Sequence, residues 1–234
     1  GRHSALLATL DRQVAGLVSA LEESGQRGST LIVFASDNGG TGRYAPSNAP
    51  LAGSKGFFYE GGVRVPLWIN GPQTRQGRWD HRPASYLDLV PTLLRVAGAD
   101  PPRELAGVDL RDPRRPPRPY FWSAAVADAQ AWSVLSADGR RRLIRDALQP
   151  TPVLYAVAAR GAARPVDEGA AAARLRRAHD AWASTTRRVQ LTLAPAAAGV
   201  FRVTGPRFQM APGSGAHALA LCTTLPPAGT SGRL

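Results

Sequence analysis

The sequence predicts a mixed α/β protein made of two parts. Residues 1–112 alternate amphipathic segments of helical period with short apolar runs, which is the order of a layered helix-and-strand domain. The stretch 113–119, rich in Pro and Arg, can neither continue a helix nor join a central strand, so it predicts a stiff linker. Further short apolar runs and one long Ala- and Arg-rich segment predict a small antiparallel β-sheet subdomain with a packed helix at 120–224, followed by a disordered tail at 225–234.

The composition is that of a globular protein with an excess of basic residues. Hydrophobic residues make up 44% and charged residues 20% of the chain, and the formal net charge is +12. Of the 29 basic residues 28 are arginine, and Ala, Gly and Pro are abundant, which is typical of GC-rich coding rather than of a polyanion partner. We therefore expect no nucleic-acid partner. No apolar run of about 18 residues predicts a membrane span, and the single cysteine excludes an internal disulfide.

The first segment predicts a helix with one apolar face. Ser4 is placed to cap its start and Gly25 to end it. A strand follows directly, so the two elements are half of a βαβ unit and imply a further element upstream. The apolar residues recur at helical spacing: Leu6, Leu7, Leu10, Val14, Leu17, Val18 and Leu21.

A candidate metal site follows the first strand. Residues 31–35 are a continuous apolar run, which predicts a strand buried on both faces. Asp37 and Asn38 come just after its carboxyl end, the edge at which open α/β sheets bind ligands. One anionic and one neutral side-chain oxygen suit a hard cation, so we predict that these two residues bind Ca²⁺, with Mg²⁺ as the second possibility.

A candidate catalytic cation lies in the long polar loop that continues to Gly62. Lys55, between Gly53 and Gly56, is the only lysine in the chain. Its retention in an arginine-rich sequence indicates a position that requires a compact ammonium rather than a planar guanidinium. An ammonium beside a metal can hold an anionic ester or stabilise a leaving oxygen. The other polar residues of the loop are interpreted as exposed loop positions: Arg43, Tyr44 and Asn48.

Two further elements complete the first part. Residues 63–69 predict a second strand, in which we interpret Arg64 as a structural ion-pair partner of Glu60. The run from Asp88 to Gly98 has a cap candidate, a proline in its first turn and a terminal glycine, so it predicts a helix. Its apolar side is expected to pack on the sheet: Leu89, Val90, Leu93, Leu94 and Val96.

The second part is predicted from short apolar runs and one hairpin signal. Asp138 and Gly139 indicate a hairpin turn between two of the strands. We expect the arginines of the preceding connector to be solvated, with an acidic partner as the alternative. The predicted strands are residues 120–122, 132–135, 143–144 and 153–157, with further candidates at 189–193, 200–204 and 218–222.

One helix is predicted to cover the small sheet. Residues 168–188 are rich in Ala and Arg, with apolar residues at helical spacing. His179 and Asp180 lie on this helix, and we interpret them as a helix-surface ion pair rather than a catalytic dyad. The apolar positions are Leu175, Ala178 and Trp182.

Four consecutive blocks of the first part closely resemble the carboxyl-terminal half of the catalytic domain of the sulfatases, in the alkaline-phosphatase-like superfamily. The blocks are SDNGG, PLAGSKG, FYEGGVRVPL and SYLDLVPTLLRVAGA, and the likeness runs from about Leu6 to Asp112. The resemblance implies a partial alkaline-phosphatase-like α/β sandwich and a sulfuric ester hydrolase acting on a sulfated small molecule or carbohydrate. It also implies that Asp37 and Asn38 bind the active-site Ca²⁺ and that Lys55 contacts the sulfate and the nucleophile.

The family nucleophile is not found in this sequence. The resemblance implies a formylglycine made from a CxPSR or SxPSR motif in the amino-terminal half of the domain, together with a paired aspartate. Neither motif occurs here, and Cys222 is followed by TTLP. We therefore expect the chain to be a fragment that is inactive by itself, and the resemblance favours a periplasmic or secreted protein.

Three alternatives stay open at this point. A phosphodiesterase or phosphonate hydrolase of the same superfamily would use the same metal residues. A non-catalytic module could instead bind acidic polysaccharide through its arginines. The third alternative is that the isolated chain does not fold stably, since the missing half would leave a sheet edge and apolar surface uncovered. The sequence indicates neither the sulfate ester nor the oligomeric state.

Overall fold

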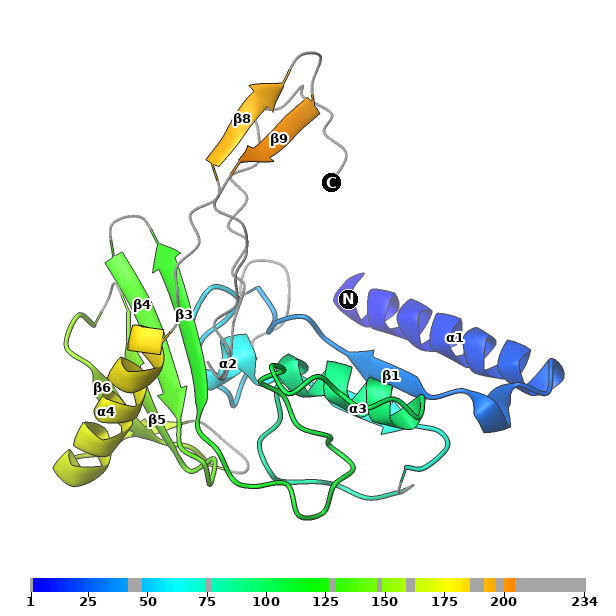
Figure 1. Ribbon diagram of the computed structural model, residues 1–234, viewed down its shortest axis with the longest axis horizontal. Helices are drawn as coiled ribbons and strands as arrows, with labels where there is room; N and C mark the ends of the chain where they lie inside the picture. The colour runs from blue at the N-terminus through cyan, green and yellow to red at the C-terminus, as the bar shows by residue number, and fades with distance from the viewer. Residues whose placement is uncertain are drawn as a thin grey trace.

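The chain folds into a helix-rich amino-terminal part and a compact antiparallel sheet, shown side by side in Figure 1. No helix in the described part of the chain combines the length and the apolar character that crossing a membrane requires. The computed structural model describes residues 2–41, 48–74, 77–126, 129–146, 149–158, 163–185, 192–196 and 200–204.

The amino-terminal part contains the two predicted strands and both predicted helices. The strands pair antiparallel, with Val33 opposite Ile69. The first helix ends before Gly25, whose positive φ of 70° is the backbone conformation expected at that position. In chain order the elements are α1 (Arg2–Glu23), the 3-10 turn η1 (Arg27–Ser29), β1 (Ile32–Ala35), α2 (Glu60–Val63), β2 (Leu67–Asn70), the 3-10 turn η2 (Tyr86–Asp88) and α3 (Leu89–Val96).

Several burial predictions for this part are wrong. Strand β1 is half-buried along its length rather than buried on both faces. The apolar face of α1 is open to solvent, with Leu6 68% exposed, and on α3 the predicted core residue Val90 is 50% exposed. The reason is the size of the sheet in the described residues: β1 pairs only with β2, and a two-stranded ribbon offers too little surface to cover two helices.

The second strand also begins later than predicted. Val63 is the last residue of the short helix α2, and β2 runs from Leu67 to Asn70. Pro66 lies directly before the strand, where its missing N–H costs no ladder hydrogen bond. The predicted strand is therefore present, but the helical turn in front of it was not predicted.

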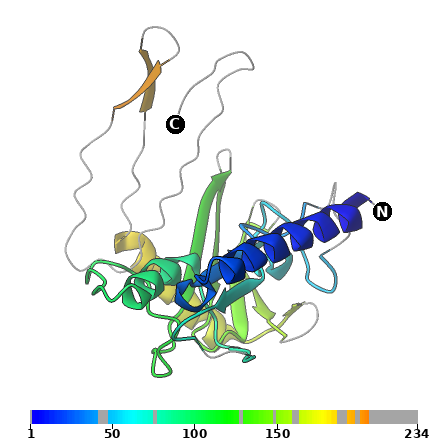
Figure 2. The same ribbon diagram turned by 90° about the vertical axis from the view of Figure 1, so that its right-hand side faces the viewer.

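The second part is an antiparallel sheet, as predicted, and in the described residues it has a fifth strand beyond the four expected between residues 120 and 157. The strands follow one another in chain order, and Gly139, with a φ of 72°, lies in the predicted hairpin between β4 and β5. One face of the sheet lies against a helix, and Figure 2 shows both from a second side. The strands are β3 (Tyr120–Val126), β4 (Ala129–Leu135), β5 (Arg141–Arg145), β6 (Val153–Ala156) and β7 (Arg164–Pro165).

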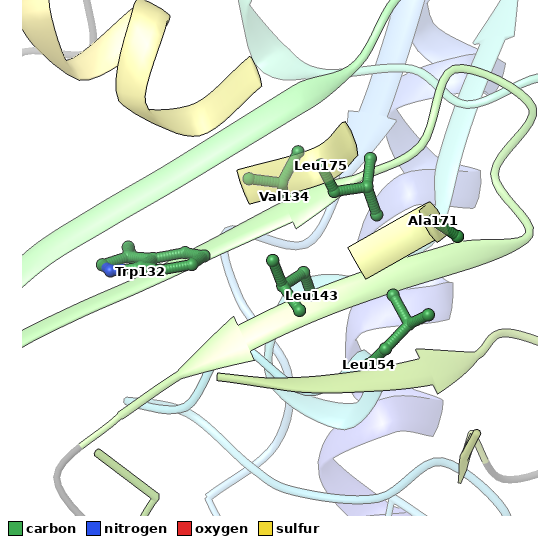
Figure 3. Close-up of a cluster of buried hydrophobic side chains, with 6 residues drawn as sticks. All are labelled: Trp132, Val134, Leu143, Leu154, Ala171 and Leu175. Atoms are coloured by element: carbon green, nitrogen blue, oxygen red, sulfur yellow. The ribbon is translucent and has the colours of Figure 1, made fainter. Parts of the chain in front are cut away.

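Helix α4 (Gly169–Thr185) covers this sheet and completes the main core, as predicted. The buried cluster between them consists of Trp132, Val134, Leu143, Leu154, Ala171 and Leu175 (Figure 3). A separate antiparallel pair follows, β8 (Thr192–Ala196) and β9 (Val200–Thr204). Of the strand expected at 189–193, residues 192 and 193 belong to β8 and the others lie outside the described residues. The strand predicted at 218–222 and the tail at 225–234 lie outside the described residues.

Two of the three arginines in the connector are held by carboxylates, which corrects the prediction for them, whereas Arg114 is exposed as predicted. The guanidinium of Arg115 is buried and lies 3.0 Å from the carboxylate of Asp80. Arg118 forms an ion pair with Asp88, which is fully buried. Both arginines therefore fasten the connector to the amino-terminal part of the chain. The domain boundaries themselves stay a prediction.

A buried ion pair fastens α2 to the small sheet. The Nε atom of Arg142 on β5 lies 2.7 Å from the carboxylate of Glu60, and the two side chains are 3% and 5% exposed. Burial lowers the pKa of Arg142, and the charge of Glu60 opposes that shift. The predicted pair between Arg64 and Glu60 is also present, at 3.7 Å. Next to it the ring of Tyr59 packs edge-on against Tyr155. Helix α2 is therefore held in place from outside its own part of the chain.

We predict that Glu60→Gln lowers the free energy of unfolding by about 3–5 kcal/mol, because Arg142 would keep a buried charge without its partner. Urea unfolding of the purified protein measures this. Glu168→Gln is the matched control, because it breaks a solvent-exposed pair with Arg141, the residue before Arg142 on β5, and should cost far less stability. Equal losses in the two variants would contradict the importance of the buried pair.

Candidate active site

A tight turn directly after β1 presents the predicted metal ligands. The N–H of Ser36 donates to the carbonyl of Pro66 at 3.3 Å, which extends the β1–β2 pairing by one step. The Ser36 hydroxyl then donates to the carbonyl of Asn38 at 2.9 Å, and the N–H of Asn38 donates to Oδ1 of Asp37 at 2.9 Å. The turn leaves the Asp37 side chain exposed and Asn38 half-buried.

Glycines bring this turn into backbone contact with α2. The N–H of Gly39 donates to the carbonyl of Gly62 at 2.9 Å. A Cβ atom on Gly39 would lie 1.7 Å from the carbonyl oxygen of Gly61, and a Cβ on Gly61 would lie 2.4 Å from the carbonyl oxygen of Gly53. No side chain fits at either position, so three backbone segments stack directly on one another.

The same stacking brings the loop that carries Lys55 to the turn. The N–H of Lys55 donates to the carbonyl of Gly40 at 3.1 Å, and the lysine side chain is exposed. Asn48 is not an exposed loop residue as expected: its amide nitrogen donates to the carbonyls of Gly40 and Gly53 at 3.0 and 2.9 Å. It therefore ties the two ends of the loop together. The other two loop residues singled out from the sequence, Arg43 and Tyr44, lie outside the described residues.

Sequence reasoning missed Tyr86, whose hydroxyl donates to the carbonyl of Ser36. Burial and the negative charge of Asp37 raise the pKa of Tyr86, so its hydroxyl keeps the proton that it donates. The contact joins residues that are 50 positions apart, so no local sequence pattern predicts it.

The side chains of Asp37 and Asn38 fit part of a cation site. Asp37 offers a carboxylate, and Asn38 uses its amide nitrogen to donate to the carbonyl of Gly39 at 2.8 Å, so its Oδ1 oxygen is the atom that it can offer to a metal. Both are hard oxygen donors. Within the described ranges no group of three or more His, Cys, Asp and Glu side chains could hold a metal ion, so a complete site needs further ligands.

The pair formed by His179 and Asp180 on α4 has a structural role. The Nδ1 atom of His179 lies 3.0 Å from Asp180, and Arg176 also donates to this aspartate. The pair is formed as predicted, but His179 is buried rather than on the surface, because its ring stacks on Trp132 with centroids 4.0 Å apart. His179 thus belongs to the packing of α4 on the sheet.

We predict that Gly39→Ala destabilises the protein by about 3 kcal/mol, the upper end for an overpacked site, because the new methyl group would overlap the backbone of Gly61. Thermal and urea unfolding measure the effect. The control is Gly16→Ala in α1, where a Cβ meets nothing and the better helix former should be neutral or stabilising by up to about 1 kcal/mol. A neutral Gly39→Ala variant would mean that the turn does not need this contact.

Comparison with known proteins agrees with the resemblance. Residues 2–99 match the family model described as Sulfatase. Arylsulfatase A of Bos taurus is 41% identical over 108 residues, which are 44% of this chain and 21% of that protein. Steryl-sulfatase of Mus musculus is 36% identical over 121 residues (47% and 19%), and N-acetylgalactosamine-6-sulfatase of Sus scrofa is 35% identical over 118 residues (47% and 22%). The match spans about a fifth of the length of these relatives.

Solved structures extend the likeness to the second part of the chain. The crystal structure of Ps i-CgsB in complex with k-i-k-neocarrahexaose superimposes with a TM-score of 0.64 and 26% identity, over 74% of this chain and 40% of that one. A candidate sulfatase from Bacteroides thetaiotaomicron matches in fold, with a TM-score of 0.55 and 20% identity over 75% and 39%. The predicted fold, a partial alkaline-phosphatase-like α/β sandwich followed by a small antiparallel sheet with a packed helix, is confirmed. Over residues 2–99 this chain is therefore similar to the sulfatases in sequence, and its fold is similar to that of solved sulfatase-like structures.

Proposed function

We propose that this chain forms part of the active site of a sulfuric ester hydrolase. The observation that carries the proposal is the hydrogen bond from the N–H of Lys55 to the carbonyl of Gly40, at 3.1 Å. It brings the only lysine of the chain next to the turn that presents Asp37 and Asn38. An anion-binding ammonium beside two oxygen donors for a cation is the combination that hydrolysis of an anionic ester requires.

Each residue has a distinct proposed role. Asp37 supplies a negative charge and Asn38 a neutral oxygen to a Ca²⁺ ion, with Mg²⁺ as the second candidate. When bound, such an ion would polarise the sulfate and favour the reactive form of the nucleophile. The ammonium of Lys55 holds an anionic oxygen of the ester and neutralises the charge that develops on it. The remaining metal ligands and a formylglycine nucleophile come, in this proposal, from a segment outside these 234 residues.

The proposed substrate is a sulfated carbohydrate. The solved relative at 26% identity was crystallised with k-i-k-neocarrahexaose, and one curated relative is named for a sulfated N-acetylgalactosamine. The similar identity to a steryl-sulfatase makes a sulfated small molecule the second substrate class.

We predict that Asp37→Ala in the complete enzyme abolishes Ca²⁺ binding and lowers kcat/KM for an aryl sulfate by at least about 10³-fold, since a metal ligand and its charge are lost. Calorimetric titration with Ca²⁺ and steady-state kinetics measure the two effects. Asp11→Ala, which removes an exposed carboxylate from α1, should leave both unchanged. Full activity of Asp37→Ala would remove this residue from the metal site.

We predict that Lys55→Arg lowers kcat by about 10²–10³-fold without changing Ca²⁺ affinity, because a guanidinium does not reproduce the compact charge of an ammonium. The same assay run with an aryl phosphate separates the reaction types. A higher kcat/KM on the phosphate ester than on the sulfate ester would assign the chain to a phosphoryl-transferring relative instead. Turnover of neither ester, with binding of acidic polysaccharide that survives loss of both Asp37 and Lys55, would indicate a non-catalytic module.

A further inference from the structure

The backbone around Tyr86 is held rigidly by a buried carboxylate. Tyr86 is the first residue of η2, and Ser85 caps this turn by accepting from the N–H of Leu87 at 3.3 Å. The N–H of Ser85 in turn donates to Asp88 at 2.9 Å. Asp88 is fully buried and also accepts from the N–H of Val108 at 2.8 Å. The point from which the Tyr86 side chain extends is therefore fixed by hydrogen bonds on both sides.

From this point the tyrosine hydroxyl reaches the residue that precedes Asp37. It donates to the carbonyl of Ser36, whose N–H is bonded to Pro66 at 3.3 Å and whose hydroxyl is bonded to the carbonyl of Asn38 at 2.9 Å. All three polar groups of Ser36 are thus engaged. The orientation of the peptide unit that leads into Asp37 is set by these bonds.

The Asp37 side chain has little support of its own. In the part of the chain that the structure describes, its carboxylate accepts one hydrogen bond, from the neighbouring N–H of Asn38, and it is exposed. Its direction therefore depends on the backbone of the turn. That backbone is fastened on one side by Tyr86 through Ser36, and on the other by the bond from Gly39 to Gly62 at 2.9 Å.

We propose that Tyr86 is a positioning residue for the turn that carries Asp37 and Asn38, and that its hydroxyl raises the affinity of this turn for a divalent cation. The inference rests on the proposed function. Tyr86 acts through the backbone of Ser36 and does not touch the ester. It links the Asp88-centred hydrogen bonds, in the segment that ends in α3, to the metal ligands at the end of β1. Partners that orient metal ligands commonly change metal affinity by about 10- to 100-fold when they are removed.

The test compares two tyrosines that make the same kind of bond. Tyr86→Phe removes the hydroxyl that donates to Ser36, and Tyr120→Phe removes one that donates to the carbonyl of Pro83 at 2.7 Å. Ca²⁺ is titrated calorimetrically into the complete enzyme after chelation, and thermal unfolding without Ca²⁺ is followed in parallel. We expect Tyr86→Phe to raise the Kd for Ca²⁺ by about 10-fold or more, and Tyr120→Phe to stay within about twofold of the wild type.

A second readout separates positioning from catalysis. Because Tyr86 does not touch the reacting atoms, the kcat of Tyr86→Phe should return to near the wild-type value when Ca²⁺ is raised well above the new Kd. A kcat that stays low at saturating Ca²⁺ would overturn the positioning role.

The remaining outcomes are also distinguishable. Wild-type Ca²⁺ affinity in Tyr86→Phe overturns the inference and leaves the proposed function standing. Equal weakening by Tyr86→Phe and Tyr120→Phe, with equal loss of thermal stability, overturns it as well, since the effect would then be one of general stability. Failure of the wild-type enzyme to bind Ca²⁺ overturns the metal site of the proposed function, and the inference falls with it.

Discussion

The direct contact between the backbones of Gly39 and Gly61 is the constraint on which the candidate site depends. It places the turn after β1 against α2 with no side chain between them. The residue beside Gly61 is Glu60, whose buried pair with Arg142 belongs to the carboxyl-terminal sheet. The small sheet therefore does more than extend the protein, because it holds the helix against which the turn with Asp37 and Asn38 is packed.

Buried charges join the segments of this protein. Glu60 and Asp88 are buried carboxylates, and each receives an arginine from the second half of the chain, Arg142 in one case and Arg118 in the other. Such pairs add little net stability compared with apolar packing, since the cost of removing both charges from water offsets their attraction. They do discriminate between arrangements, because any other packing would leave a charge buried and unpaired. We infer that they fix how the two parts meet.

The sequence predicted local structure well and contacts between distant segments poorly. Helical period located α1 and α4, and short apolar runs located β3, β4, β5 and β6, because these signals lie within a few residues of one another. The burial of Arg115 in the connector was not predicted. Local composition indicates only a stiff, charged segment, whereas this burial depends on Asp80, 35 positions earlier. Asp37, Asn38 and Lys55 could be selected by chemistry, and their roles stay proposals. Tyr86 could not be selected, since a hydroxyl bonded to a distant carbonyl leaves no pattern in the sequence.

The side-chain amide of Asn48 makes the position of Lys55 independent of the length of the loop before it. This amide bonds the carbonyls of Gly40 and Gly53, and the N–H of Lys55 donates to the same carbonyl of Gly40, so the backbone of Lys55 is tied to the start of the loop. Changes in the sequence or length between Gly40 and Asn48 then leave the backbone of Lys55 in place, because each doubling of the length of a closed loop costs only about 0.6 kcal/mol. Under the proposed function, variation in this segment changes which ester is accepted, while the residues that act on the ester stay in place.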